Sequence, residues 1–244
     1  MKKIIAAAAA FVLMCQPVSV SALSSTSHGY GQGTQTDSSN CPLGASDFSH
    51  IYGKFDAFAL SEDPERIILT FDQGYENGYT EKILDTLKEK NVKSIFFLTG
   101  DYAKKETALV NRMIEEGHTL GNHGMTHAKF PELSDAELRE EISSLHEYVL
   151  GTYGYEMQYL RPPCGEYSEK SLSISKSLGY KTVMWSFAYV DWNTDSQPDP
   201  CEALKQMTDS AHGGAIYLLH SVSSTNAEVL GQLIDSLRSA GYNL

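Results

Sequence analysis

Short apolar runs alternate with longer amphipathic segments along most of this 244-residue chain, and the alternation limits the folds open to it. Runs typical of strands occur at 66–71, 94–98, 119–122, 158–160, 181–185 and 215–219. Segments with helical spacing of apolar residues occur at 80–89, 106–116, 134–149, 168–178, 201–211 and 227–239. Strands separated by helices of this length form βαβ units with a parallel sheet. We therefore expect a single α/β domain, a closed or nearly closed (β/α) barrel in preference to an open sheet.

The first 22 residues have the pattern of a secretory signal peptide. Lys2 and Lys3 precede an apolar run from Ile4 to about Cys15, and small residues end at Ala22, where we expect cleavage. A membrane anchor is the less favoured alternative, because about 20 apolar residues are needed to cross a bilayer. Cleavage would move the formal net charge from −12 to −14. We expect a secreted, acidic protein without a nucleic-acid partner, since an anionic surface repels phosphate backbones.

The remaining chain divides into three parts. Residues 23–46 are mainly Ser, Thr, Gly and Gln, a composition typical of a flexible linker. We expect an N-terminal extension packed on the barrel at 47–65 and the catalytic domain at 66–244. Loss of Cys15 would leave an odd number of cysteines, which requires a free thiol or an intermolecular pair. A disulfide between Cys164 and Cys201 is one option, which their spacing does not decide.

Five unusual polar residues follow the predicted strands, where the carboxyl ends of a parallel barrel converge on one pocket. They are Asp72, His123, Arg161, Asp191 and His220. We therefore expect these side chains to share one mouth of the barrel.

The spacing of His123 and His127 favours a metal site over two solvated loop histidines, because four residues of helical turn bring both imidazoles to one face. Asp72 directly follows a buried strand, so it is either a turn or cap aspartate or a general base. As a base, it would be kept ionised by pairing with Arg161, while the metal activates the attacking water.

His220 ends an apolar strand, where it is either a buried core histidine or a general acid oriented by Asp191. The remaining histidines have simpler interpretations, and His118 is expected to be structural. Glu137, Glu140 and Glu141 are expected to form a solvated helix face.

Together these motifs resemble the polysaccharide deacetylase domain, that is, carbohydrate esterase family 4 or the NodB-like domain. They are Thr70-Phe71-Asp72-x-Gly74, His123-x3-His127, Arg161-Pro162-Pro163-x-Gly165, Asp191-Trp192 and Leu218-Leu219-His220. Longer strings at 74–80, 159–163, 190–192 and 215–220 resemble the branch that removes the N-acetyl group from muramic acid during δ-lactam formation in spore-cortex peptidoglycan. The resemblance covers the chain from about Ile67 to its end.

The resemblance implies a distorted (β/α) barrel that performs metal-assisted hydrolytic N-deacetylation of peptidoglycan in the cell wall. Asp72 would be the base held by Arg161, and His220 would be the acid partnered by Asp191. His123 and His127 would bind one divalent metal, with zinc as the first choice and cobalt or manganese as the alternatives. Residues implied to contact the substrate are Tyr75, Pro163, Cys164, Gly165, Trp192 and Leu218. The backbone N–H near Cys164 would serve as an oxyanion donor. We expect a monomer that acts on glycan strands.

Two positions depart from the family pattern. Gln73 replaces the aspartate that is usually the third metal ligand, and because an amide oxygen is a weaker donor, the metal should be held less tightly. Gly124 replaces a hydroxyl residue and removes one hydrogen bond behind the ligands. Two alternatives therefore stay open. One is a deacetylase of another glycan, such as a chitin-type oligomer or O-acetyl xylan, and the other is a catalytically impaired glycan-binding homologue.

Overall fold

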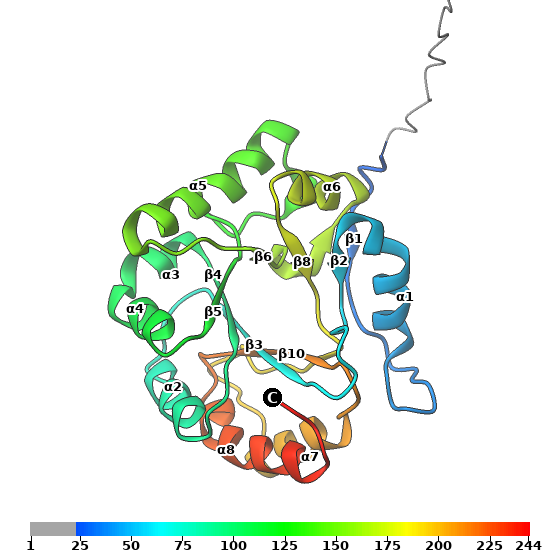
Figure 1. Ribbon diagram of the computed structural model, residues 1–244, viewed down its shortest axis with the longest axis vertical. Coiled ribbons are helices and arrows are strands. Elements are labelled where there is room, and N and C mark those ends of the chain that lie inside the picture. The colour runs from blue at the N-terminus through cyan, green and yellow to red at the C-terminus, as the bar shows by residue number, and fades with distance from the viewer. Residues whose placement is uncertain (1–22) are drawn as a thin grey trace, which may run out of the picture.

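The structure is a computed structural model that describes residues 23–244, so the expected signal peptide at 1–22 lies outside the described residues. Eight strands form one sheet in which all paired neighbours run parallel. Their order is β2 (Ala57–Phe58), β8 (Lys181–Val183), β6 (Tyr159–Leu160), β5 (Thr119–Asn122), β4 (Ile95–Leu98), β3 (Ile68–Gln73), β10 (Ile216–His220) and β9 (Phe187–Ala188). The sheet curls into an incomplete barrel (Figure 1). The prediction of a single-domain distorted barrel is confirmed.

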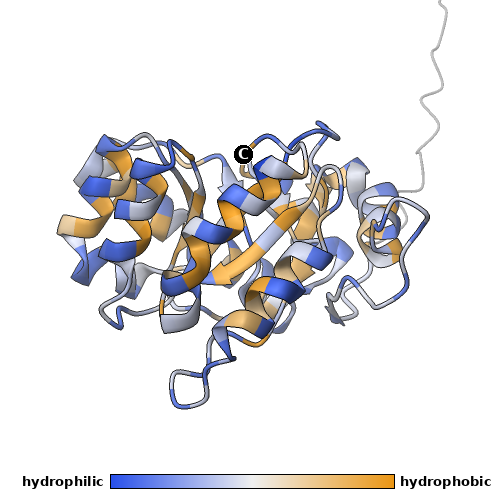
Figure 2. Ribbon diagram, turned by 90° about the horizontal axis from the view of Figure 1, so that it is seen from below, coloured by the Kyte–Doolittle hydropathy of each residue, from blue (hydrophilic) through white to orange (hydrophobic). Residues whose placement is uncertain are grey.

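Helices cover the outside of the curled sheet (Figure 1). They are α1 (Leu43–Tyr52), α2 (Thr80–Glu89), α3 (Gly100–Lys105), α4 (Thr107–Glu115), α5 (Asp135–Tyr153), α6 (Glu169–Ser177), α7 (Pro200–Asp209) and α8 (Ser224–Ser239). Short 3₁₀ turns occur at Gly53–Phe55, Phe130–Glu132 and Pro163–Gly165. The predicted helices all form, and the structure adds two that the sequence pattern did not predict, α1 and the six-residue α3. In Figure 2 hydrophobic residues concentrate on the strands and on one side of the helices.

Local sequence signals explain where α5 begins and ends. The Ser134 hydroxyl accepts from the Glu137 amide at 3.4 Å, and the Glu137 carboxylate accepts from the Ser134 amide at 2.9 Å. This reciprocal capping box satisfies two backbone donors that the helix start would otherwise leave unpaired. Gly154 ends the helix with φ of 65°, a conformation that glycine adopts without steric cost. The inner face of α5 then packs Leu138, Ile142 and other apolar residues into the core.

Residues 23–46 depart from the flexible linker that their composition predicts. Strand β1 (His28–Gly29) pairs antiparallel with β7 (Glu166–Tyr167), and α1 begins at Leu43, inside the expected linker. The Tyr30 ring lies 4.9 Å from Phe48 and 5.0 Å from Trp185, centroid to centroid. This segment is thus held against the rest of the domain with few apolar residues, because backbone pairing and one aromatic side chain supply the contacts.

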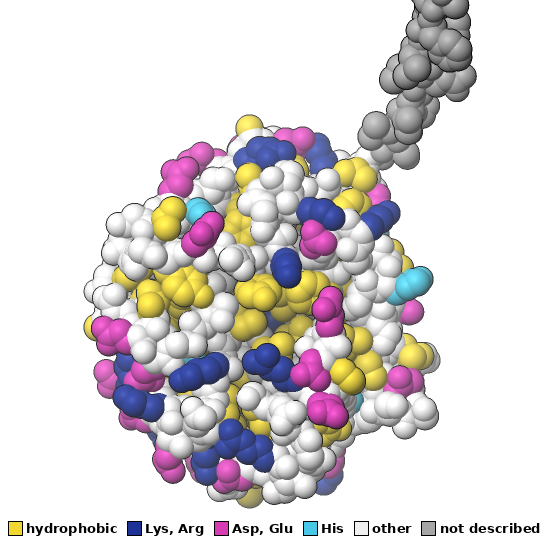
Figure 3. Space-filling model, viewed as in Figure 1, with side chains coloured by type: hydrophobic (Ala, Val, Ile, Leu, Met, Phe, Trp, Pro, Cys, Tyr) yellow, Lys and Arg dark blue, Asp and Glu magenta, His cyan; other side chains and the backbone are white. Residues whose placement is uncertain are grey.

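Cys41, Cys164 and Cys201 are all free thiols, and the candidate disulfide between Cys164 and Cys201 is not formed. Within residues 23–244, no helix is long and apolar enough to cross a membrane. Figure 3 shows hydrophobic side chains at the centre of one face, with lysine and arginine side chains near them and acidic side chains interspersed. This face has no continuous basic stripe of the kind that binds a phosphate backbone.

Candidate active site

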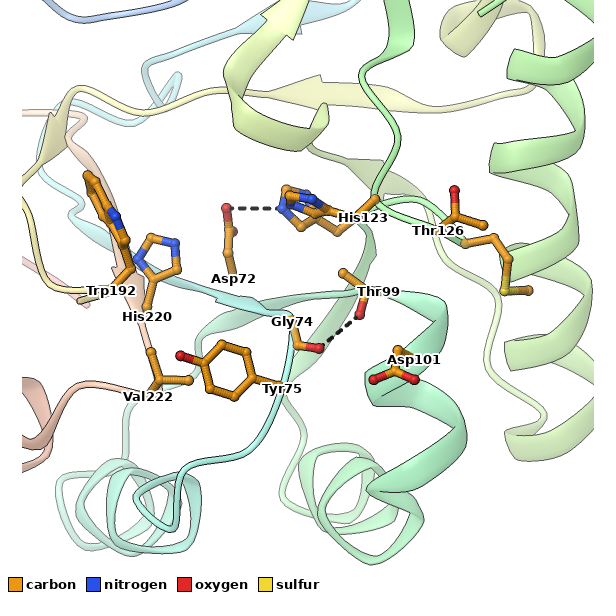
Figure 4. Close-up of a pocket in the computed structure, with 12 residues that line it drawn as sticks. Asp72, Gly74, Tyr75, Thr99, Asp101, His123, Thr126, Trp192, His220 and Val222 are labelled. Carbon is orange, nitrogen blue, oxygen red and sulfur yellow. Dashed lines mark hydrogen bonds and ion pairs between the residues drawn. The ribbon is translucent and has the colours of Figure 1, made fainter. Parts of the chain in front are cut away.

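A cavity of about 400 Å³ opens at the carboxyl ends of the central strands. Six of the residues that the sequence singled out line it: Asp72, Tyr75, His123, His127, Trp192 and His220. The other lining residues are Gly74, Thr99, Asp101, Met125, Thr126 and Val222. In Figure 4, Asp72 lies between His123 and His220, with Trp192 beyond His220. Parallel strand register brings these residues together, because every strand ends at the same mouth.

Arg161 holds Asp72 from inside the barrel. Its guanidinium is fully buried, and Nη1 donates to Asp72 Oδ1 at 2.7 Å. Nε and Nη2 donate to the carbonyl oxygens of Val183 and Met184 at 3.0 and 3.2 Å, and the ring of Phe97 lies 4.3 Å from the guanidinium carbon. Burial by itself would raise the pKa of Asp72, but the charge of Arg161 and its hydrogen bond hold that pKa below its ordinary value. Asp72 is therefore a carboxylate at neutral pH.

Asp191 holds His220 on the opposite side of the cavity. Asp191 is fully buried, and its Oδ1 lies 2.7 Å from His220 Nδ1 while its Oδ2 accepts from the His220 amide at 2.8 Å. Asn226 also donates to Oδ2, at 2.6 Å. Burial of His220 opposes its protonation, but the hydrogen bond and charge of Asp191 outweigh burial and raise the pKa above its ordinary value. The pairing occupies Nδ1, so Nε2 is the nitrogen that can transfer a proton into the cavity.

His123 and His127 form a pair of neutral imidazoles beside Asp72. Their ring centroids are 4.9 Å apart, and His123 Nε2 is 3.6 Å from Asp72 Oδ2. His123 Nδ1 lies 2.8 Å from the Arg161 carbonyl oxygen and must donate to it, which leaves the Nε2 lone pair facing the cavity. Burial lowers the pKa of His123 to about 4 and also lowers that of His127. Neutral nitrogens with lone pairs are the form that binds a divalent cation.

Gln73 does not line the cavity. Its Nε2 donates to Ser221 Oγ at 2.5 Å, while its Oε1 is buried without a hydrogen-bond partner in the described structure. Across residues 23–244, no three His, Cys, Asp or Glu side chains are grouped to hold a metal ion. The donor set therefore fits a cation bound by two imidazoles, with its other ligands coming from solvent or substrate.

The predicted substrate residues separate into two groups. Trp192 and Tyr75 are about half exposed at the mouth, and the indole lies 5.7 Å from the His220 ring. Cys164 is also exposed, in a left-handed backbone conformation with φ of 57°, but it does not line the cavity. Pro163, Gly165 and Leu218 are buried, and they do not line the cavity either. The Gly165 amide donates to the Pro162 carbonyl, so it is already engaged.

A contact from the N-terminal segment supports Arg161, and no sequence pattern predicted it. The Tyr30 hydroxyl donates to the Trp185 carbonyl oxygen at 2.5 Å, and Trp185 Nε1 donates to Gln32 Oε1 at 3.0 Å. The Trp185 ring lies 5.7 Å from the Arg161 guanidinium carbon. Tyr30 is the only aromatic residue in 23–46, and that isolated aromatic was the one available signal.

Glu141 also departs from the sequence prediction. It was expected on a solvated helix face with Glu137 and Glu140, but it is buried and accepts hydrogen bonds from the loop that carries the two histidines. Its position on α5, one residue before the apolar Ile142, places it at the edge of the packed face.

Comparisons with known proteins find similarity in both sequence and fold. Residues 60–183 match the family model described as polysaccharide deacetylase. The chain is 43% identical over 203 residues to the peptidoglycan-N-acetylmuramic acid deacetylase PdaA of Bacillus subtilis, covering 82% of this chain and 77% of that protein. It is 32% identical over 189 residues to a peptidoglycan-N-acetylglucosamine deacetylase of Bacillus cereus, with 76% and 68% coverage. The solved structure of Bacillus subtilis PdaA, a family 4 carbohydrate esterase, superposes with a TM-score of 0.85 at 39% identity, covering 91% of this chain and 95% of that one.

Proposed function

The chain belongs to the polysaccharide deacetylase family, and from this premise we propose that it hydrolyses the N-acetyl group of N-acetylmuramic acid residues in peptidoglycan. The observation that carries the proposal is the placement of an ionised carboxylate and a proton-donating imidazole, Asp72 and His220, in one cavity. These are the two groups that amide hydrolysis requires, a base for the water and an acid for the departing nitrogen. The similarity to a muramic acid deacetylase supports the choice of sugar.

In the proposed reaction Asp72 removes a proton from a water molecule as the water oxygen attacks the acetamide carbonyl carbon. Arg161 keeps Asp72 ionised and oriented through Oδ1, which leaves Oδ2 to accept the proton. His220 then gives its Nε2 proton to the sugar nitrogen as the carbon–nitrogen bond breaks. Asp191 stabilises the imidazolium before that transfer. The products are acetate and a free amine on the sugar.

The resemblance to the family implies a divalent metal, and His123 and His127 are the side chains that would hold it. Such a cation would polarise the carbonyl oxygen and lower the pKa of the attacking water. Two imidazole ligands suit zinc first, with cobalt and manganese as alternatives. Because the Gln73 side chain is hydrogen-bonded to Ser221, the metal should be bound more weakly than it would be with a third protein ligand.

Trp192 and Tyr75 would form the walls against which the sugar ring packs. Both are exposed aromatic side chains at the mouth of the cavity, where a glycan strand could lie across them. The backbone N–H of Cys164 would donate to the oxygen of the tetrahedral intermediate. Relatives that act on peptidoglycan point to the cell wall as the place of action, outside the cytoplasm.

The test is acetate release from peptide-free muramoyl glycan, measured beside chitin oligomers and acetylated xylan. We expect release from the muramoyl glycan, loss of activity with chelator, and recovery with added zinc. Mass spectrometry of the glycan should show the loss of acetyl from muramic acid. Release only from chitin or xylan would contradict the choice of substrate but keep the chemistry.

The orientation of Gln73 favours one second candidate, a glycan-binding homologue without catalysis. In that case the protein would bind muramoyl glycan and release no acetate with zinc, cobalt or manganese. Binding and acetate release measured on the same glycan distinguish the two functions.

A further inference from the structure

The buried carboxylate of Glu141 binds the segment between the two histidines. Oε1 accepts from the Thr126 amide at 2.7 Å and from the Ala128 amide at 3.3 Å, while Oε2 accepts from the Thr126 hydroxyl at 2.9 Å. The backbone carbonyl of Glu141 also accepts from the Met125 amide, at 3.1 Å. A single residue of α5 thus receives four hydrogen bonds from residues 125–128.

The residue enclosed by these bonds is His127. Its φ is 63°, in the left-handed region that side-chain-bearing residues rarely adopt. The amides on either side of His127, those of Thr126 and Ala128, both donate to Oε1 of Glu141. Glu141 therefore restrains the backbone at the residue whose conformation is least favourable. Without the Glu141 carboxylate, the backbone at His127 would be free to relax and to turn the imidazole away from Asp72.

Gly124 makes the close approach of Glu141 sterically feasible. A Cβ at position 124 would lie 2.7 Å from Glu141 Oε1, closer than real Cβ atoms come. The φ of Gly124 is 83°, which also favours glycine. The glycine that departs from the family pattern therefore has a physical reason here: it leaves room for the carboxylate, which supplies the loop with hydrogen bonds that a hydroxyl at position 124 would not.

We propose that Glu141 is a positioning residue that holds His127 in the orientation needed to bind a divalent cation together with His123. This inference rests on the proposed metal-assisted reaction. Glu141 does not line the cavity, so it acts only through His127. It offers the loop acceptors that Gly124 lacks, and it thereby sets the affinity of the imidazole pair for the metal.

The test compares cobalt binding by the whole chain in Glu141→Ala, Glu141→Gln and the unchanged protein. The readouts are titration calorimetry and the visible absorption of bound cobalt, which reports ligand geometry. We expect Glu141→Ala to weaken cobalt binding by about 10- to 100-fold, the usual effect of removing a group behind a metal ligand. Glu141→Gln should restore most of the affinity, because its amide oxygen can still accept from both backbone amides.

The controls separate positioning from general loss of structure. Glu140→Ala removes the same charge from the exposed neighbour on α5 and should leave cobalt binding unchanged. Gly124→Ala should weaken binding in the same direction as Glu141→Ala, since its Cβ displaces the carboxylate. Circular dichroism and thermal unfolding would verify that each variant is folded, and amide hydrogen exchange at Thr126 and Ala128 should speed up in Glu141→Ala.

The outcomes distinguish this inference from the proposed function. A cobalt signal that depends on His127 in the unchanged protein and persists in folded Glu141→Ala would overturn the role of Glu141 alone. If no signal in the unchanged protein depends on His127, the metal-assisted reaction and this inference both fail.

Discussion

Asp72 and His220 are direct register partners on adjacent parallel strands, β3 and β10. The proposed base and the proposed acid therefore lie side by side at the same edge of the sheet, although 148 positions separate them in the chain. A shift of one residue in that register would turn one of the two side chains out of the cavity. The relation between the strands thus fixes the geometry of the proton transfers.

Replacing Asp72 with Asn should reduce acetate release by at least about 100-fold, because general base catalysis contributes roughly 10²–10⁴ to the rate. The change also leaves the buried Arg161 charge without its partner, which costs about 3–5 kcal/mol of folding stability. Activity should therefore be measured well below the unfolding midpoint, determined by circular dichroism. Acetate release from muramoyl glycan at the rate of the unchanged protein would refute the assignment of Asp72.

Replacing Asp191 with Asn should shift the pH dependence of kcat/KM. The charge of Asp191 keeps the pKa of His220 above its ordinary value, and without it burial would push that pKa down. His220 must be protonated to act as the acid, so the alkaline limb of the profile should move to lower pH. The acidic limb should stay in place, because it reflects Asp72 and the imidazole pair. An alkaline limb that does not move would show that His220 is not the acid.

Replacing Tyr30 with Phe should lower the free energy of unfolding by about 1–3 kcal/mol, because the buried Trp185 carbonyl loses its hydrogen-bond donor. For a chain of this size that is a fall in Tm of several degrees, at about 2–4 °C per kcal/mol. We expect kcat to fall more than KM changes, since Trp185 packs over Arg161 and not over the substrate. Ser25→Ala, in the exposed part of the same segment, is the control. Equal Tm values for the two variants would contradict the supporting role of Tyr30.

Replacing Gln73 with Asp should tighten zinc binding by at least about tenfold, or 1.4 kcal/mol. A carboxylate is a stronger donor than an amide and adds a negative charge beside the imidazole pair. The neighbouring charge of Asp72 opposes ionisation of the new carboxyl, so the gain should increase as the pH rises. Titration calorimetry with Gln73→Asn as the control would measure it. Unchanged zinc affinity would mean that position 73 does not face the metal even with a carboxylate.

The sequence by itself was enough to predict the barrel and part of the set of residues that line its mouth. The alternating strands and helices predicted the parallel sheet, because hydrophobic periodicity is a local property of the chain. The residues after the strands identified Asp72, His123 and His220, because all parallel strands end at one edge. The Ser134 capping box could also be predicted from the sequence, because its hydrogen bonds join residues only three positions apart.

Only the tertiary structure decided which polar side chains serve the site and which support it. The helical pattern predicts that Glu141 is a surface acid. Its carboxylate instead accepts a hydrogen bond from the amide of Thr126, 15 positions earlier in the chain. Composition places Tyr30 in a linker, but its hydroxyl donates a hydrogen bond to the Trp185 carbonyl oxygen, 155 positions later in the chain. Gln73 follows the base directly but turns to Ser221 and away from the cavity. Contacts of this kind depend on which distant segments pack together. Composition, spacing and periodicity are local features of the sequence, so they do not predict that packing.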